Sequence, residues 1–167
     1  EKTKMAETLS VTEMIPNKFE PKRKNRWIFA IEGIDAFLIK SAARPQYTSS
    51  AQEINFINST RYVAGKMKFG TLSVTLHDPI APSGAQQVME WVRTHFESVS
   101  GRAGYADFYK RDCQLKMLDP VGTVVELWDI KGAQLNSANF GDIQYDDEGT
   151  PADIQLEIQF DNCVLQY

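Results

Sequence analysis

A strict alternation of apolar and polar residues near the carboxyl end constrains the fold of this chain most strongly. Residues 152–160 read ADIQLEIQF, so that every second residue from Ile154 to Phe160 is apolar. The residues between them are Gln155, Glu157 and Gln159. A period of two places alternate side chains on opposite faces of a β-strand. One face therefore belongs in a core, and the other meets solvent, a partner subunit or the inside of a channel.

A second stretch, residues 71–77, repeats this pattern as TLSVTLH. Its apolar face consists of Leu72, Val74 and Leu76, and its opposite face consists of Thr71, Ser73, Thr75 and His77. The pattern predicts another half-buried strand whose second face is rich in hydroxyl groups.

Further β-patterns occur at 105–110, 113–118 and 123–135. The stretches NRWIFAI (25–31) and IDAFLIK (34–40) suggest a hairpin with its turn at Glu32–Gly33. One amphipathic helix is predicted over about 83–100, with Ser83 as its N-cap, Gly101 as its stop and Trp91 off its apolar stripe. The chain is therefore predicted to be mainly β, an antiparallel barrel or sandwich with one flanking helix.

Residues 47–69 are β-prone but polar, and they suggest two strands with a tip at Asn58–Ser59. Such a hairpin has little apolar surface to pack on its own domain, and an isolated two-stranded hairpin is marginal in water. We therefore expect it to bind a partner.

The length of 167 residues fits one domain, which we expect over 25–167 after an extended N-terminal arm at 1–24. The basic cluster PKRKNR at 21–26 is interpreted as part of a solvated arm rather than a phosphate-binding patch. No secretory signal pattern and no membrane-spanning apolar run is recognisable, so neither export by a signal peptide nor membrane binding is expected.

The residues that most often carry chemistry have plainer interpretations here. Cys113 and Cys163 are expected to be buried reduced thiols, and His77 and His95 lack partners at metal-ligand spacing. The acidic run 146–148 lacks the ligand spacing of a calcium loop and is interpreted as a solvated turn. No nucleophile, phosphate-loop or zinc-protease motif is present, so we expect no enzymatic activity, no cofactor and no metal.

Taken in order, these patterns resemble the tail tube proteins of contractile-tailed, T4-like bacteriophages over 25–167. The residues that carry the resemblance are Asn25, Phe29, Ile31 and Gly33, then Pro45, VAG at 63–65, Phe69, LSVTLHD at 72–78, the helix with Trp91, and the alternating C-terminal strand. The family is related to the tube proteins of type VI secretion and other contractile injection systems.

The resemblance implies a structural virion protein of the phage tail, assembled in the host cytoplasm. Six copies would form a ring with a continuous inner β-barrel, and stacked rings would enclose the tape-measure protein and conduct DNA without sequence-specific binding. Its other partners would be the sheath, baseplate and tail terminator proteins. The hairpin would reach a neighbouring subunit or ring through Glu53, Ile54, Asn55, Phe56, Asn58, Arg61 and Tyr62.

A channel wall in such a ring would be lined by Thr71, Ser73, Thr75, Gln155, Glu157 and Gln159. Residues 104–167 carry four basic and twelve acidic residues, which suits a wall that must not retain phosphates. Two alternatives remain open: a tube protein of a phage-derived bacteriocin or secretion system, and a monomeric ligand-binding β-barrel.

Overall fold

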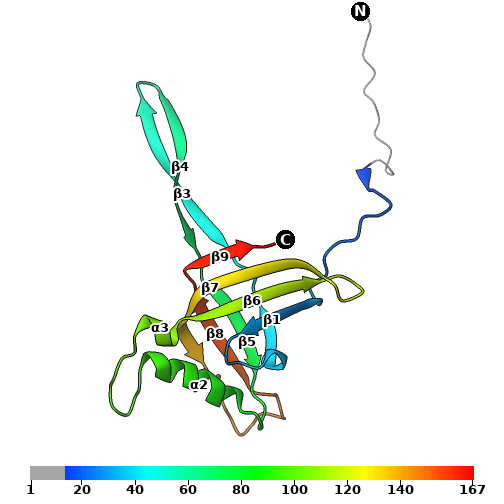
Figure 1. Cartoon of the computed structure of the whole chain (residues 1–167), viewed down its shortest axis with the longest axis vertical. Coiled ribbons are helices and arrows are strands. Elements are labelled where there is room, and N and C mark those ends of the chain that lie inside the picture. Colours follow the sequence, from blue (N-terminus) through cyan, green and yellow to red (C-terminus); the bar gives the residue numbers. More distant parts are fainter. Residues whose placement is uncertain (1–13) are drawn as a thin grey trace, which may run out of the picture.

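The computed structural model describes residues 14–167, and its ordered elements are mostly strands (Figure 1). In chain order they are β1 (Trp27–Ile31), the 3-10 helix η1 (Ala36–Leu38), β2 (Ile39–Ala42), β3 (Tyr47–Phe56), β4 (Ser59–Phe69), β5 (Leu72–His77), α2 (Gly84–His95), α3 (Ala106–Tyr109), β6 (Arg111–Leu118), β7 (Val124–Asn139), β8 (Asp153–Gln159) and β9 (Asn162–Leu165). The mainly antiparallel β fold with one substantial helix confirms the fold class predicted from the sequence.

Seven strands form one sheet in the order β1-β6-β7-β8-β5-β2, with β9 also paired to β7. The long strand β7 pairs with β6 and β9 through its first part and with β8 through residues 134–139. It changes partners just after Gly132, where a register shift and a φ of +68° mark a bulge. Such a bulge bends a strand, and the sheet folds into two halves at this point.

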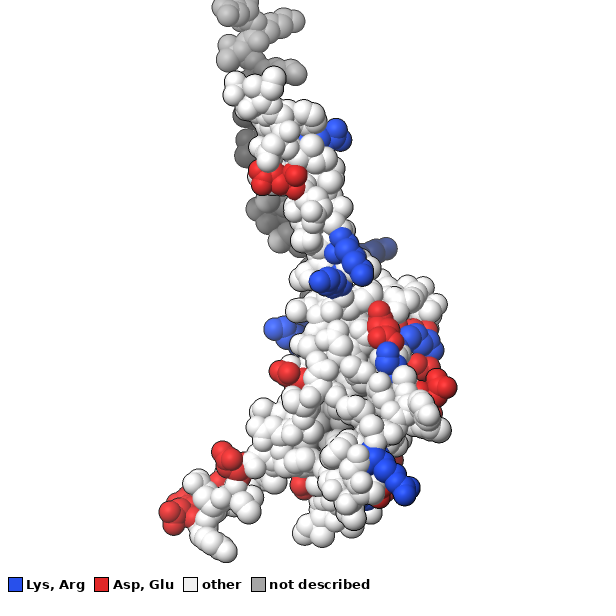
Figure 2. Space-filling model, turned by 90° about the vertical axis from the view of Figure 1, so that its left-hand side faces the viewer, with Lys and Arg blue, Asp and Glu red and all other residues white. Residues whose placement is uncertain are grey.

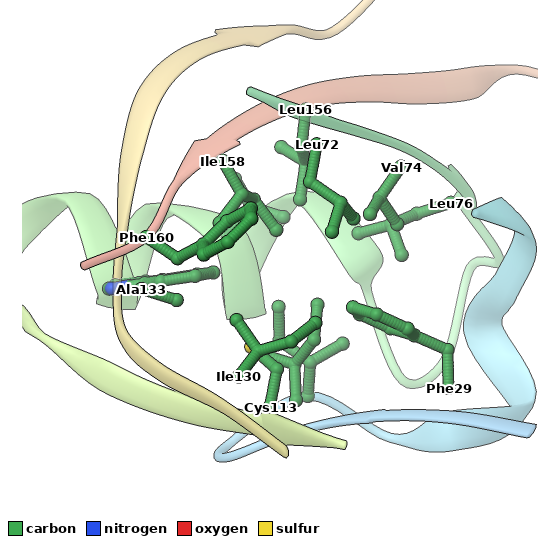
Figure 3. Packing of buried hydrophobic residues seen from close by; sticks show 14 of the residues in the cluster. Phe29, Leu72, Val74, Leu76, Cys113, Ile130, Ala133, Leu156, Ile158 and Phe160 are labelled. Carbon is green, nitrogen blue, oxygen red and sulfur yellow. The ribbon is translucent and has the colours of Figure 1, made fainter. Parts of the chain in front are cut away.

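The first half-sheet consists of β1, β6, β9 and residues 124–131 of β7, and the second consists of β2, β5, β8 and residues 134–139 of β7. The apolar residues of the two halves point toward one another (Figure 3). Phe29, Cys113 and Ile130 come from the first half, and the alternating apolar residues of β5 and β8 come from the second. Ile154, Leu156, Ile158 and Phe160 are all at most 3% exposed, so the core face predicted for this strand is confirmed.

The helix α2 begins where the sequence predicts, because the Ser83 hydroxyl accepts a hydrogen bond from Gln86 N at 3.4 Å. It ends at His95 rather than near residue 100, since Phe96 takes an extended conformation and forms a bridge with Ala103. The sequence places Trp91 off the main apolar stripe but favours a packing role for it, and the structure confirms that Trp91 is packed. Its ring is 1% exposed, and its Nε1 donates a 2.7 Å hydrogen bond to the Tyr109 carbonyl.

Two local predictions were wrong, the first because β1 and β2 pair with strands that are far away in the sequence. β1 pairs with β6 and β2 pairs with β5, so 25–31 and 34–40 do not form a hairpin, although one bridge joins Ile31 and Ile34. The stretch 105–110 is the short helix α3 packed on α2, not a strand. For β1 and β2, pairing with strands distant in sequence overrides the local hairpin pattern.

Both cysteines are free thiols. Burial raises the pKa of Cys113 to about 12 and that of the half-buried Cys163 to about 11. The prediction of full burial is therefore confirmed for Cys113 only. No helix within residues 14–167 is long and apolar enough to cross a membrane.

Residues 1–13 of the predicted arm lie outside the described residues, and 14–24 contain no strand. This segment is tied to the sheet at Glu126 of β7, which is 4% exposed and is the one buried charged residue within 14–167. Lys22 Nζ and Trp128 Nε1 donate hydrogen bonds to its carboxylate, and Arg44 Nη1 lies 3.7 Å from Oε1. Burial alone would raise the pKa of Glu126, but these donors and charges outweigh it and lower that pKa. One carboxylate thus joins the arm to the segment between β2 and β3.

The substitution Glu126→Gln should lower the free energy of unfolding by about 1–3 kcal/mol at neutral pH, because it removes charge-assisted hydrogen bonds to a buried carboxylate. A depressed folded-state pKa contributes stability that is present above the ordinary glutamate pKa and is lost as pH falls through the folded-state value. Urea unfolding should therefore show a difference between wild type and variant that shrinks as the solution is acidified.

A matched control is Asp112→Asn, which removes an exposed ion pair with Lys131 at 3.1 Å. It should change the free energy of unfolding by no more than about 0.5 kcal/mol. Equal effects of the two substitutions would show that the Glu126 contacts do not stabilise the fold.

Candidate functional site

The outer face of the second half-sheet forms a continuous polar surface across four strands. Its backbone register places the polar residues of neighbouring strands side by side, since directly paired residues share a face. The rows run Ser41–Thr75–Gln155–Asn139, then Ser73–Glu157–Ser137, then Gln159–Gln134. Hydroxyl and amide groups dominate these rows, and Glu157 is their one charged member.

The basic side chains closest to these rows, Lys40 and His77, are both beside Asp153, which shares a face of β8 with Gln155 and Glu157. Lys40 of β2 donates a 2.7 Å hydrogen bond to Asp153 Oδ2 at the end of β8. His77 is paired with the same Asp153 across β5 and β8, with Nδ1 and Oδ1 3.9 Å apart. The rows themselves contain no lysine or arginine, so they offer no cation to a phosphate backbone.

The structure brings most of the predicted wall residues together. Ser73 and Thr75 lie in β5 directly opposite Glu157 and Gln155 of β8. Gln159 is half-buried, and its Nε2 donates a 3.3 Å hydrogen bond to the Phe69 carbonyl.

Other parts of this face differ from the prediction. Thr71 is exposed but precedes β5, so it is outside the strand ladder. The sequence reasoning missed Ser41 on β2 and the residues of β7 beyond 135, because it ended that strand at 135. The available signal was the alternation of Ser137 and Asn139, which face the polar side, with Ala138, which packs against the core.

The hairpin of β3 and β4 projects from the end of the molecule opposite α2 (Figure 1). Its two strands pair only with each other, and every residue of β3 is exposed. In the space-filling view it is a narrow extension with few charged side chains and with basic side chains where it joins the body (Figure 2). The prediction of a hairpin over 47–69 is confirmed, and its turn is Ile57–Asn58, one residue earlier than predicted.

The two faces of the hairpin differ in chemistry. One face carries Ile54 opposite Arg61 and Phe56 opposite Ser59. The other face carries Glu53 opposite Tyr62 and Asn55 opposite Thr60, whose hydroxyl donates to Asn55 Oδ1 at 3.0 Å. All seven residues predicted for this interface are exposed, with Phe56 at 59% and Tyr62 at 65%. The analysis of the sequence missed other exposed apolar residues of the hairpin, namely Tyr47, Ile57 and Met67.

Gly65 explains why the hairpin is bent near its base. The register shifts between Ser49 and Ala51, so β4 carries one extra residue there. A Cβ at position 65 would lie 2.2 Å from the Ser50 carbonyl oxygen, which no side chain tolerates. The glycine of the VAG triplet is therefore required for close backbone approach at this bulge.

The second half-sheet leaves two strand edges without partners in the described part of the chain. β2 pairs with β5 on one side only, and residues 134–139 of β7 pair with β8 on one side only. Unpaired backbone N–H and C=O groups on such edges readily bind another strand. Both edges border the same polar face.

In the acidic loop between β7 and β8, the Asp147 side chain stabilises a turn by accepting hydrogen bonds from backbone N–H groups of the same loop. Asp147 Oδ1 accepts hydrogen bonds from Gly149 N at 3.0 Å and Thr150 N at 2.8 Å, and these bonds lower the Asp147 pKa. Within residues 14–167 no group of three His, Cys, Asp or Glu side chains is arranged to hold a metal ion.

No protein-family model matches the sequence, and no curated protein matches it by sequence similarity. Solved structures do match its fold. A chain of the anti-feeding prophage tube-terminating cap has a TM-score of 0.72 at 14% identity, covering 95% of this chain and 99% of that one. A chain from the sheath/tube terminator structure of an extracellular contractile injection system, PVC, has a TM-score of 0.71 at 12% identity, covering 90% and 99%.

A chain of the SPP1 tail tube is more distant, with a TM-score of 0.52 at 12% identity, covering 87% of this chain and 78% of that chain. At these identities the likeness concerns the fold. The chain therefore has the fold seen in tube assemblies of contractile injection systems, which confirms the structural side of the resemblance drawn from the sequence.

The double substitution Ile54→Asp/Phe56→Asp should change the monomer's free energy of unfolding by no more than about 0.5 kcal/mol, because both side chains lie on the projecting hairpin. By contrast, Leu156→Ala in the core should cost about 2–5 kcal/mol. Urea unfolding measures both. Comparable losses would show that the hairpin packs on its own subunit.

Proposed function

We propose that this chain is the structural subunit of the inner tube of a contractile tail. Six copies form each ring, and the second half-sheets of the copies join into one inner barrel whose polar face lines the channel. The observation that carries the proposal is a four-stranded antiparallel half-sheet with one polar face and two free edges. The fold shared with chains of sheath-tube and tube-cap assemblies supports it.

The number of strands makes ring closure regular. Because the half-sheet has four antiparallel strands, β2 and β7 run in opposite directions. A rotation about the ring axis therefore brings β2 of one copy antiparallel to residues 134–139 of β7 in the next. Edge pairing of this kind gives a heterologous contact that closes into a ring. Each contact between neighbouring copies then uses the same antiparallel strand pairing as the contacts between strands within one subunit.

The size of the resulting barrel suits passage of a nucleic acid. Six copies of four strands give about 24 strands, and a spacing of ~4.8 Å with a tilt of ~40° gives a circumference near ~150 Å. The backbone diameter is then about 48 Å, which leaves a channel of several tens of ångströms after side chains are allowed for. A wall of hydroxyl and amide groups with Glu157 binds no phosphates, so DNA would pass without being retained.

In this function the particle is a phage tail assembled in the host cytoplasm. The tube would enclose the tape-measure protein and meet the sheath, baseplate and tail terminator proteins. The similarity to an extracellular contractile injection system favours a second candidate, the tube protein of a phage-derived bacteriocin or secretion-type contractile injection system. A monomeric ligand-binding barrel is less well supported, because it leaves the exposed hairpin and both free edges without a role.

Assembly tests the proposal directly. Purified wild-type protein should form rings or tubes by electron microscopy as its concentration rises, whereas Ile54→Asp/Phe56→Asp should remain folded and unassembled because charged residues replace apolar contacts on the hairpin. Gln114→Lys, on the outer face of the first half-sheet, should assemble as wild type does. A wild-type protein that stays monomeric under every condition would overturn the proposal.

The substitution Glu157→Lys tests the channel wall. It places a cation on each copy at the polar face, so rings should still form while DNA ejection slows by roughly tenfold at low salt and less at high salt. Dye-detected DNA release from particles carrying the variant tube measures this rate. Gln114→Lys is the control, because it also introduces a lysine but on the outer face of the first half-sheet. Unchanged ejection would show that this face does not line the channel.

A further inference from the structure

A cationic cleft lies at the foot of the hairpin, between the arm and β2. It has a volume of about 450 Å³, and Trp27, Leu115 and Met117 form its apolar floor. Its basic lining residues are Lys22, Arg23, Lys24, Lys40 and Arg44. Five cations around one hollow would repel one another unless anions reached them.

The carboxylates of the same subunit neutralise only part of this charge. Glu126 lies beside Lys22 and Arg44, Asp153 beside Lys40, and the exposed Glu20 is 3.8 Å from Arg23. Five cations thus face three carboxylates. Lys66 and Lys68 near the end of β4 add further positive charge. Basic side chains are seen where the hairpin joins the body (Figure 2). The cleft therefore fits a partner that carries several carboxylates on a narrow segment.

The chain itself contains such a segment. The loop 140–152 between β7 and β8 includes Asp142, Asp146, Asp147 and Glu148 and no lysine or arginine. All four side chains are exposed, and none forms an ion pair with another part of the described chain. Asp147 already holds the turn through Gly149 and Thr150, which keeps the loop in a compact shape.

The acidic loop and the foot of the hairpin are set apart, although Lys40 at one side of the cleft pairs with Asp153, which directly follows the loop. The loop lies with α2 at the end away from the hairpin (Figure 1), and acidic side chains gather at that end in the space-filling view (Figure 2). Within one copy, none of the four loop carboxylates forms an ion pair with a basic residue of the cleft. A second copy placed end to end with the same orientation can bring its loop to the foot of the first copy's hairpin.

We propose that the cationic cleft receives the acidic loop of a second copy in the adjacent ring. The inference rests on the proposed tube function and adds the surfaces through which rings stack. The same contact also fixes the relative orientation of stacked rings. Basic ends facing each other, or acidic ends facing each other, would place like charges together, which costs several kcal/mol. Only the head-to-tail arrangement pairs opposite charges, so the stack grows with one polarity.

Charge reversal and its rescue test the inference. Arg23→Glu/Lys24→Glu reverses the cleft and spares the cations that hold Glu126, while Asp146→Lys/Glu148→Lys removes the net negative charge of the loop and spares the turn residue Asp147. Each variant should form rings but tubes shorter by roughly tenfold, because the attraction between cleft and loop is lost at every ring junction. One chain carrying all four substitutions should regain wild-type tube length. Lys116→Glu/Lys131→Glu, on the first half-sheet, should leave length unchanged.

A second experiment detects the contact between cleft and loop directly. Carbodiimide cross-linking of a mixture of isotopically light and heavy wild-type chains should join peptides containing residues 22–24 to peptides containing 146–148 in different chains. Circular dichroism confirms that each variant is folded. Reversed variants with tubes of wild-type length, or a fourfold variant without rescue, would overturn the inference while leaving the tube function standing. A wild-type chain that forms no rings would instead overturn the proposed function.

Discussion

The burial of apolar side chains between two halves of one bent sheet is the constraint on which the rest of this structure depends. β5 and β8 each present an unbroken apolar row to the core, including Leu76 and Ile154 with no exposed surface. Burying apolar surface stabilises the fold by roughly 25 cal/mol per Å², so neither strand can rotate to place its polar row in the core. Their polar residues are thereby fixed on the opposite face, and the candidate channel wall follows from the packing of the core.

The same constraint explains why the polar face of the second half-sheet is continuous. A shift of one residue in the pairing of β5 with β8 would expose the core row and bury Glu157, so the register is held by burial on one side. The bulge at Gly132 then carries β7 from the first half-sheet to the edge of the second. A single strand thus closes the core and also supplies the free edge at which a neighbour can add.

Local patterns in the sequence predicted the features that depend on local chemistry. The alternation around Leu156 gave the core face and its polar opposite, Ser83 gave the start of the helix, and the polar content of 47–69 gave an exposed hairpin. What failed depends on contacts distant in sequence. Trp27–Ile31 pairs with residues more than eighty positions away, and the Trp91 indole N–H donates to the Tyr109 carbonyl of α3, where a strand was predicted. Periodicity carries no information about such partners.

For the proposed ring to form, the free edges of the monomer have to be kept from binding the wrong strands. β2 has only four residues and carries Lys40, and short charged edges pair poorly with unrelated strands. The hairpin likewise exposes single apolar side chains among hydroxyls and charges rather than one broad apolar patch. Each contact available to the monomer is therefore weak alone. A neighbour related by rotation can engage an edge and a hairpin together, and a neighbour along the axis can pair cleft with loop. Because several weak contacts form at once only in that geometry, the correct assembly is favoured over any single misplaced pairing.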